Sequence, residues 1–505
     1  MKYKGIKIVS KVSVPDKNAL SIVYTPGVAA ASLEIKENPE ASFDYTNREN
    51  SIAVISFDYE KSLERAVFLK SALNIDAYPL EIAGREPEKI KLVIDNIEPS
   101  FGAIDLSLIS DYVQDIDFDV KIPVLKGIAP DLKEFFLCIS KNLFMFKYED
   151  LKGTAGEKSL ELRKRAGGVI ETELTENEEK KPVGIITDGS AVLGLGNIGA
   201  EAGLPVMEGK AVLFQKLGGV SAMPLCLKTQ NPDEVIEIVL LLQNSFSGVN
   251  LEDIKAPECF KIENTLIEKA DIPIFHDDQH GTAIAVTAAL LNALHLAGRK
   301  LNEVKIVFSG AGAAAIAVCR LLLDAGAENI IMFDIDGAVY KGRSSNNEAH
   351  EKIAEKTNLN GFKGSLKEGI KGADVFIGLS AANVLNADMV KSMNNKPAVF
   401  ALANPIPEIM PDEALRAGAF IAASGRSDFK NQINNSLVFP GLFKGVLKHG
   451  VKKITQKMKI NCALALASMI KDDELSADYI LPDALDMRVP DTIADSIIME
   501  NYAGC

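Results

Sequence analysis

Short apolar runs alternate with longer amphipathic stretches along most of this chain. The runs at 183–188, 304–309 and 330–334 are rich in Val, Ile and Phe and end in Asp or Ser, which is typical of buried strands. The stretches between them place apolar residues three and four positions apart, which predicts helices. Strands that alternate with helices indicate an α/β fold with parallel sheets.

The second half of the chain carries the complete pattern of a dinucleotide-binding unit. The run at 304–309 is followed by a G-x-G-x-x-A turn, a helix predicted from Ala313 to Ala325, and the run at 330–334. Such a turn lets the backbone approach a pyrophosphate, and the first turn of the helix offers its free N–H groups to that anion. We therefore expect cofactor contacts from Gly310, Ala311, Gly312, Ala313 and Ala314.

Asp334 ends the second strand of this unit. An acid at this position can bond the ribose 2′-hydroxyl of NAD and would repel the 2′-phosphate of NADP. Lys341 and Arg343 follow in the next loop and could still bind a phosphate. The sequence therefore predicts a nicotinamide cofactor, with NAD preferred and NADP left open.

A second glycine cluster follows the run at 183–188. Gly194, Gly196 and Gly199 also form a G-x-G-x-x-G, but no acid ends a second strand after it. A nucleotide loop and a tight phosphate or substrate loop are both open at this place.

Apolar runs at 373–380, 398–404 and 419–424 continue the α/β pattern toward the C-terminus. Asn404 and Asn434 lie near the predicted carboxyl edge of these strands. Amides suit hydrogen bonds to a carboxylate or a carboxamide, although Asn in a turn more often serves the backbone.

Four acidic residues lie within a short span near the middle of the chain. Glu252 and Asp253 lie upstream of the apolar run 272–275, and Asp277 and Asp278 follow that run after His276. Acids at the carboxyl end of a strand, next to a helix start, are where α/β proteins place ligand sites. Because Mg²⁺ and Mn²⁺ take oxygen ligands, these residues predict a divalent cation site; a solvated acidic surface is the alternative.

Residues 66–109 align without a gap onto residues 211–254. Ten of the forty-four positions are identical, and most of the others keep their polarity. The later stretch 121–125 repeats the pattern of 271–275. This indicates an internal duplication of a β/α half-domain, rather than two amphipathic units that are alike by patterning alone.

The two copies differ where chemistry would take place. Lys210 of the second copy is matched by Arg65, which cannot readily lose a proton. The acidic residues of the second copy are matched by Ser107, Leu108, Lys126 and Gly127. We therefore expect the first copy to be structural or regulatory.

Tyr24 stands beside a Thr-Pro-Gly turn, within residues 18–36 that are predicted to form a strand or turn and then a helix. A tyrosine at such a bend is more often a packing residue than a catalyst. Farther along, the charge pattern predicts a helix over 158–165 and an exposed connector over 172–181.

Length, charge and cysteine usage narrow the classes of protein that fit. A chain of 505 residues requires two or more domains. A net charge of -14 argues against nucleic acid or an anionic membrane as a partner, and no apolar run approaches the length of a membrane span. The first residues lack an apolar signal segment, and the six cysteines lack C-x-x-C spacing. We expect a reducing compartment, with the cytoplasm as the default and an organelle matrix left open.

Several long stretches resemble the malic enzyme family, of the shorter bacterial type. The stretches that carry the resemblance are VYTPGVA (23–29), ITDGSAVLGLGNIG (186–199), GLPVMEGKAVLF (203–214), FSGVNLEDIKAPECF (246–260), FHDDQHGTAI (275–284), GAGAAA (310–315), FALANPIPEIMP (400–411) and GRSDFKNQINNSLVFPG (425–441). They occur in family order. The block 51–182 departs from the family, in which the tyrosine segment runs almost directly into the ITDGS strand.

The resemblance and the repeat together predict the domain organisation. We expect an α/β N-terminal catalytic domain that carries a degenerate duplicated half-domain, then a Rossmann-type NAD(P)-binding domain with a C-terminal helical segment. The parts are a tyrosine segment (1–50), the inserted repeat and connector (51–182), the catalytic domain (183–300), the Rossmann domain (301–450), and a tail (451–505) that begins with an amphipathic helix over 451–475.

The resemblance implies oxidative decarboxylation of (S)-malate to pyruvate and CO2, with NAD(P)⁺ and Mg²⁺ or Mn²⁺. Lys210 is then the base that takes the C2 hydroxyl proton, which requires burial or nearby cations to lower the pKa of a lysine. Tyr24 is the acid that protonates C3 of the enolate.

The resemblance also assigns the remaining site residues. Glu252, Asp253 and Asp278 are the metal ligands, and the metal is chelated by the C2 oxygen and C1 carboxylate of malate. Asp277 orients Lys210. Substrate or nicotinamide contacts are assigned to Asn404 and Asn434. In the longer eukaryotic branch an arginine helps to bind malate where this chain has Ala191.

Other functions stay open on the sequence alone. One is a metal-dependent enzyme that decarboxylates oxaloacetate, or converts malate to lactate and retains NAD. Another is a non-catalytic sensor of malate or nucleotide, which suits the first copy because its base and acids are gone. The family implies a homodimer or higher homo-oligomer, in which Tyr24 serves either its own chain or a neighbour.

Overall fold

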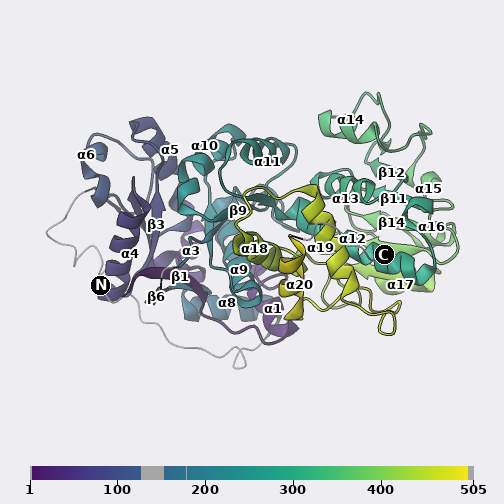
Figure 1. Ribbon diagram of the computed structural model, residues 1–505, viewed down its shortest axis with the longest axis horizontal. Helices are drawn as coiled ribbons and strands as arrows, with labels where there is room; N and C mark the ends of the chain where they lie inside the picture. Colours follow the sequence, from purple (N-terminus) through teal and green to yellow (C-terminus); the bar gives the residue numbers. More distant parts are fainter. Residues whose placement is uncertain (1–2, 127–152, 178, 499–505) are drawn as a thin grey trace. The chain divides into compact units, whose positions relative to one another are not determined.

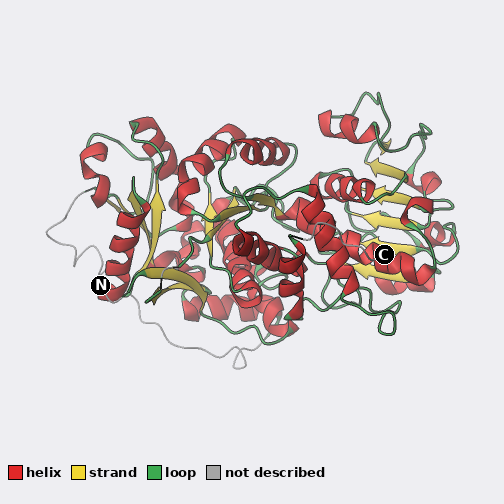
Figure 2. Ribbon diagram, viewed as in Figure 1, coloured by secondary structure: helices red, strands yellow, loops and turns green. Residues whose placement is uncertain are grey.

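The apolar runs of the sequence form the strands of the sheets, and the amphipathic stretches form helices that flank them (Figures 1 and 2). The computed structural model describes residues 3–126, 153–177 and 179–498. The chain divides into two units: Met1–Phe275 with Val451–Lys453, and His276–Gly450 with Ile454–Cys505. The boundary falls within strand β10 (Ile274–His276).

The second copy of the repeat forms a four-stranded sheet in the first unit. Its strands are β7 (Val183–Thr187), β8 (Ala222–Cys226), β9 (Gly248–Leu251) and β10, in the order β8-β7-β9-β10. Its helices are α9 (Ala200–Gly218), α10 (Pro232–Leu242) and α11 (Glu258–Lys269). β7 pairs in parallel with β8 and β9, and it is buried along its whole length, as expected for a sheet with helices on its faces.

The first copy forms a second sheet of the same topology. Its strands are β2 (Ser51–Ser56), β3 (Asp76–Glu81), β4 (Ala103–Asp105) and β5 (Val124–Leu125), in the order β3-β2-β4-β5. Its helices include α4 (Tyr59–Leu73), α5 (Pro87–Ile97) and α6 (Ser110–Val113). α5 and α10 begin and end at equivalent positions, which confirms the duplication. Gly127, which the sequence comparison matches to the second acid of the Asp277-Asp278 pair, lies outside the described residues.

The segments before each copy pack together and correct two expectations. β1 (Gly5–Ser10) pairs antiparallel with β6 (Ile170–Thr175), so the predicted connector over 172–181 is a strand in its first part. The start of 18–36 is also helical rather than a strand, because the Asp16 side chain caps α1 (Lys17–Val23). The other helices here are α2 (Ala29–Glu37), α3 (Ser42–Tyr45) and α8 (Ala155–Ala166). The last of these contains the helix predicted over 158–165.

The second unit is built on a six-stranded sheet in the order β13-β12-β11-β14-β15-β16. The strands are β11 (Lys305–Ser309), β12 (Asn329–Asp334), β13 (Gly337–Ala338), β14 (Val375–Gly378), β15 (Ala398–Ala401) and β16 (Ile421–Ser424). All neighbouring strands except β12 and β13 run parallel. The chain passes from one side of β11 to the other, which creates the switch point where such sheets bind ligands.

The second unit contains nine named helices in its described part, and several of them, including the last three, pack mainly on other helices. The nine are α12 (Asp277–Ala297), α13 (Ala313–Asp324), α14 (Glu348–Ala354), α15 (Leu366–Gly369), α16 (Ala387–Lys391), α17 (Pro411–Arg416), α18 (Phe439–His449), α19 (Gln456–Ser468) and α20 (Arg488–Ser496). The predicted helix over 451–475 is therefore shorter than expected. The tail also holds a further helix, α20, which accepts Pro490 because a first turn needs no N–H from that residue.

One helix corrects the expectation that no apolar run approaches the length of a membrane span. Within the described part of the chain, α12 alone has the length and apolar composition of a membrane span, and 67% of its apolar window is buried in the protein. A core helix passes the same test.

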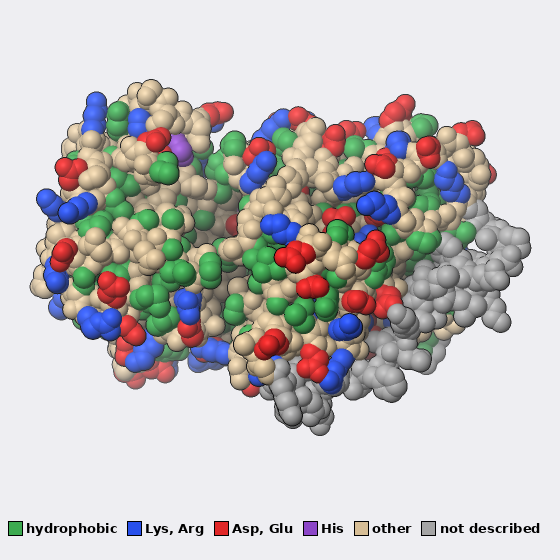
Figure 3. Space-filling view, turned by 180° about the vertical axis from the view of Figure 1, so that it is seen from behind, with side chains coloured by type: hydrophobic (Ala, Val, Ile, Leu, Met, Phe, Trp, Pro, Cys, Tyr) green, Lys and Arg blue, Asp and Glu red, His purple; other side chains and the backbone are tan. Residues whose placement is uncertain are grey.

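On the face drawn in Figure 3, basic and acidic side chains are interspersed.

Candidate active site

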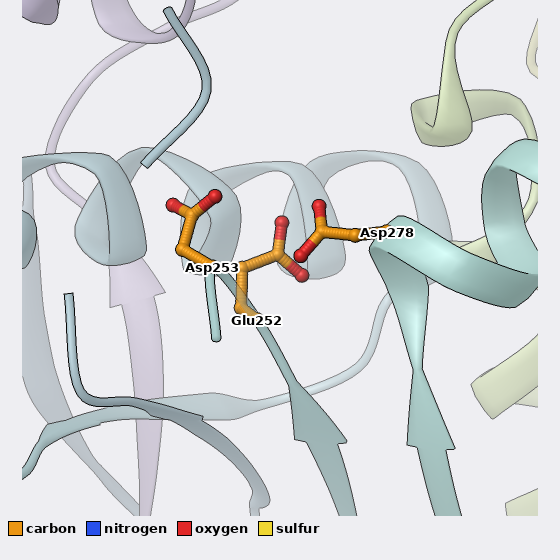
Figure 4. Close-up of side chains that lie close together, drawn as sticks. All are labelled: Glu252, Asp253 and Asp278. Carbon is orange, nitrogen blue, oxygen red and sulfur yellow. The ribbon is translucent and has the colours of Figure 1, made fainter. Parts of the chain in front are cut away.

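Three carboxylates meet at the carboxyl ends of two neighbouring strands. Glu252 and Asp253 directly follow β9, and Asp278 lies two residues after β10. One oxygen from each carboxylate lies within 4.8 Å of the other two. Figure 4 shows the carboxylates of Glu252 and Asp278 facing each other, with Asp253 beside them. A donor set made only of carboxylate oxygens fits a hard divalent cation such as Mg²⁺ or Mn²⁺.

Local backbone structure explains why these three side chains converge. Asp253 adopts a left-handed conformation with φ of 53°, and its carbonyl accepts a hydrogen bond from the N–H of Ala191 at 2.8 Å. α12 begins at Asp277, four residues before the helical run predicted from Gly281. Asp278 therefore lies in the first turn of a long helix, where the positive end of the helix stabilises an anion.

Lys210 lies on α9 with its side chain fully buried. Its Nζ donates to Oε1 of Glu252 at 2.6 Å, and the Asn250 amide donates to the other oxygen of that carboxylate at 3.0 Å. The predicted base thus contacts a predicted metal ligand directly. Asp277 is also fully buried, and its predicted role in orienting Lys210 stays a prediction.

Tyr24 packs against the helix that carries Lys210. It follows the last residue of α1 and is 8% exposed. A Cβ placed on Gly209 would lie 3.1 Å from Cδ2 of the Tyr24 ring and 2.8 Å from the carbonyl oxygen of Val23. Only glycine therefore fits at position 209. The ring of Tyr24 lies beside Gly209 of α9, and Gly209 directly precedes Lys210 in the sequence. Tyr24 and Lys210 belong to the same chain.

Arg163 is a buried cation of this region that the sequence pattern does not reveal. Its guanidinium donates to Glu208 at 3.0 Å, to the carbonyl of Pro205 at 2.8 Å and to that of Val23 at 3.2 Å. It therefore ties the residue before Tyr24 to the helix of Lys210. Burial lowers the pKa of Arg163 and raises that of Glu208, although the ion pair opposes both shifts.

The glycine turn of the second unit has the conformation expected of it. Gly310 has φ of 110°, and a side chain there would collide with the carbonyl of Leu379. Gly312 is the N-cap of α13, so the free N–H groups of that helix follow it. His350, which the sequence analysis missed, places a ring nitrogen 2.9 Å from the carbonyl of Ala311.

Asp334 ends β12 as predicted, but it is paired with a cation. Arg343 donates to both of its carboxylate oxygens, to Oδ1 at 2.7 Å. Burial alone would raise the pKa of Asp334; hydrogen bonds from Arg343 and from the N–H of Asp336 outweigh it and lower the pKa. The acid that the sequence predicts to favour NAD and the arginine that could bind a 2′-phosphate are therefore in contact.

The two predicted amides make local contacts. The Asn404 amide donates to the carbonyl of Leu402 at 3.2 Å, and Asn434 accepts from the N–H of Ser436 at 2.8 Å. Glu408, missed from the sequence, is fully buried and accepts from the N–H groups of Ser380 at 2.8 Å and Ala403 at 3.0 Å.

These contacts of Glu408 join the loops after β14 and β15. Burial raises the pKa of this carboxyl. A single acid in an N-P-I-P-E stretch carries no sequence signal of such a role.

The fold and site define a class of protein: an α/β protein with a Rossmann-type nucleotide-binding unit and an acidic cluster beside a buried lysine. Residues 152–267 match the family description "Malic enzyme, N-terminal domain", and residues 279–500 match "Malic enzyme, NAD binding domain". The chain belongs to the malic enzyme family. Among its relatives is the bifunctional malic/malolactic enzyme of Bacillus subtilis, 52% identical over 62% of this chain and 77% of the relative. The NAD-dependent malic enzyme of Geobacillus stearothermophilus is 47% identical over 64% and 68%.

Solved structures agree with this membership. The NAD-dependent malic enzyme of Thermotoga maritima is similar with a TM-score of 0.60 at 34% identity, covering 96% of this chain and 94% of that one. The malic enzyme of Entamoeba histolytica is similar with a TM-score of 0.61 at 42% identity, covering 63% of this chain and 68% of that one. Both family matches begin after residue 151, so the first copy lies outside them.

Proposed function

We propose that this protein catalyses the NAD(P)-dependent oxidative decarboxylation of (S)-malate to pyruvate and CO2 with a divalent metal ion. The observation that supports this most directly is the contact between buried Lys210 and Glu252, which is also a member of the three-carboxylate group. Glu252 contacts the proposed base and also belongs to the proposed cation site. The base and the cation can therefore act on the same hydroxyl group of a substrate.

The metal site is formed by Glu252, Asp253 and Asp278. A bound Mg²⁺ or Mn²⁺ supplies Lewis acidity that favours the charge developing on the C2 oxygen. Glu252 is 2% exposed and Asp253 is 3% exposed, so these ligands are largely shielded from water. Electrostatic interactions are stronger in such a setting than at a solvated surface.

Lys210 and Tyr24 divide the proton transfers of the proposed reaction. Lys210 would take the proton of the C2 hydroxyl, and a bound nicotinamide would supply the acceptor for the hydride of C2. After CO2 departs, Tyr24 delivers a proton to C3 of the enolate. The packing of the Tyr24 ring beside Gly209 supports this assignment, because it keeps the two groups on adjoining elements.

The nicotinamide cofactor is bound by the turn from Gly310 to Ala314, with NAD preferred over NADP. Asp334 would accept a hydrogen bond from the ribose, and its charge disfavours a 2′-phosphate. The contact with Arg343 keeps that carboxylate ionised and fixes its position. Asn404 and Asn434 would contact the substrate or the nicotinamide from the loops that follow β15 and β16.

A malolactic reaction is the second candidate, because one similar protein is named a bifunctional malic/malolactic enzyme. In that reaction the hydride returns to the product and lactate forms. The test incubates malate with Mn²⁺ and either NAD⁺ or NADP⁺, and follows reduced cofactor, pyruvate and lactate together. Reduced cofactor equal to pyruvate supports the main proposal, whereas lactate without reduced cofactor supports the second. No turnover with either cofactor would leave a non-catalytic malate or nucleotide sensor as the better explanation.

A further inference from the structure

The two copies of the repeat contact each other through reciprocal hydrogen bonds. The N–H of Glu81 donates to Oγ of Ser245 at 2.7 Å, and the N–H of Cys226 donates to Oγ of Ser100 at 2.7 Å. In the alignment Glu81 is equivalent to Cys226, and Ser100 is equivalent to Ser245. Exchanging the two copies of the repeat therefore turns the first hydrogen bond into the second.

A second pair of hydrogen bonds obeys the same rule. The N–H of Ala83 donates to the carbonyl of Leu241 at 2.8 Å, and the N–H of Lys228 donates to the carbonyl of Asn96 at 3.0 Å. Ala83 is equivalent to Lys228, and Asn96 is equivalent to Leu241. Because these two bonds join backbone atoms, the side-chain differences between the copies do not affect them.

Contacts of this kind are the signature of a two-fold axis. In an isologous interface, residue i of one subunit contacts residue j of the other, and j contacts i in return. Homodimers of separate chains pair in this way. Here both sides belong to one chain, and α5 lies against its own equivalent, α10, across the same interface.

We propose that residues 51–126 act as a built-in partner subunit for residues 183–275, so that a single chain completes the site of Lys210 and Tyr24. Residues 51–126 thereby occupy the face that would otherwise pair with a second copy. The inference rests on the proposed function only for the roles of these two residues.

The path of the chain supports this arrangement. Residues 8–50, which contain Tyr24, lead directly into β2 of the first copy. Yet the Tyr24 ring packs on α9 of the second copy, and β1 pairs with β6, the strand that precedes the second copy. The tyrosine therefore crosses the pseudo-two-fold axis. If the two halves were separate chains, each site would take its tyrosine from the neighbour.

The equivalent place in the first copy has lost its acids and its lysine. Arg65 stands where Lys210 stands in the second copy, and its Nε donates to Asp105 at 2.9 Å. Asp105 is fully buried, so the pair neutralises itself. Within the described residues, the three-carboxylate group of the second copy has no counterpart in the first. The pair of halves thus keeps one complete site.

Cross-linking tests whether the halves pair within one chain. The Asn244 amide donates to Oε1 of Glu81 at 2.7 Å across the interface. We would introduce Glu81→Cys with Asn244→Cys, on a chain in which Cys138 and Cys505 are changed to serine, and treat the folded protein with a short bismaleimide. The expected product has the mass of one chain. After digestion, the peptide that contains Cys at position 81 should be linked by the reagent to the peptide that contains Cys at position 244.

The controls for this experiment are the two single variants, which should give no joined peptide. A product with the mass of two chains would show that the first copy of one chain pairs with the second copy of another, and would overturn the proposal. Failure of the double variant to cross-link at all would also overturn it, because the two side chains are in contact.

A complementation experiment tests the site itself. Tyr24→Phe and Lys210→Ala chains with different tags are co-expressed and purified through both tags, beside a doubly tagged wild-type pair. We expect the wild-type pair to be active and the mixed pair to show no activity beyond that of each variant alone. Recovery in the mixed pair, toward half of the wild-type rate, would mean that Tyr24 is shared between chains. An inactive wild-type pair would contradict the proposed function, and the cross-linking result would still decide the pairing.

Discussion

The guanidinium of Arg163 and the carboxylate of Glu208 form an ion pair at 3.0 Å in which neither side chain is exposed beyond 1%. The same guanidinium donates to the carbonyl of Val23, the residue before Tyr24. Glu208 lies two residues before Lys210 on α9. The pair therefore joins the tyrosine segment of the first copy to the helix that carries the lysine of the second.

Removing one partner of this pair should destabilise the protein strongly. Arg163→Ala leaves the Glu208 carboxylate buried without its cation, which costs about 3–5 kcal/mol in such settings. We expect a loss of that size in the free energy of unfolding, measured by urea denaturation of the first unit's transition. Arg165→Ala on the same helix is the matched control, because its pair with Glu161 is exposed and should cost at most about 1 kcal/mol. Equal losses for both variants would contradict the assignment.

The acidic group should bind divalent metal through Asp278. Asp278→Asn removes the charge of one of the three proposed ligands. Loss of a residue that only supports a metal ligand lowers metal affinity roughly 10–100-fold, so we expect the affinity for Mn²⁺ to fall by at least that factor. Isothermal titration of the purified protein with Mn²⁺ alone measures this without any turnover. Asp271→Asn, an exposed acid just before β10, should leave the affinity unchanged. An unaltered affinity in Asp278→Asn would exclude this residue as a ligand.

Tyr24→Phe should slow catalysis while preserving the fold. The ring still packs beside Gly209, but the hydroxyl that we propose as the acid for C3 is gone, and a positioned acid contributes roughly 10²–10⁴-fold. We expect kcat for pyruvate formation to fall within that range, with little change in KM for malate. Tyr45→Phe, in the same N-terminal segment, serves as the control. A variant with unchanged kcat would show that Tyr24 is a packing residue, as tyrosines at bends usually are.

Cofactor preference should follow the contact between Asp334 and Arg343. Asp334→Asn removes the charge that disfavours a 2′-phosphate and weakens the hold on Arg343. A charge-assisted hydrogen bond contributes about 1.5–3 kcal/mol, so the ratio of kcat/KM for NADP⁺ over NAD⁺ should rise by about 10–100-fold. Adding Arg343→Gln should abolish that gain. Asp336→Asn is the control, and a gain of similar size there would mean that net charge alone sets the preference.

The pattern of residues predicted the parts of the fold that depend on local sequence. The strand, glycine turn, helix and acid around Gly310 are contiguous, so their relationship is written in a single stretch. The repeat could be read because Ser100 and Ser245 kept their register. Glu252, Asp253 and Asp278 could be grouped because neighbouring parallel strands bring their carboxyl ends together.

The remaining features depend on contacts between distant segments. Arg163 looks like its basic neighbours in the sequence, and only the packing of α8 against α1, α2 and α3 decides which of them is buried. The sequence pattern predicts a connector where β6 begins, because its partner strand, β1, lies far away in the sequence. The position of Tyr24 beside α9 has the same cause, since no local pattern tells a segment which copy it will join.

The reciprocal bonds at Ser100 and Ser245 have an evolutionary consequence. In a dimer of identical chains every mutation is made twice, so a half that loses its lysine loses it in both sites at once. Fusion ends that coupling, because each half is encoded separately and mutates alone. It also holds the halves together at an effective concentration set by the tether, on the order of millimolar for short flexible links, whatever the amount of protein in the cell. Under the proposed pairing, the first copy can lack the chemistry of the site while it keeps its shape.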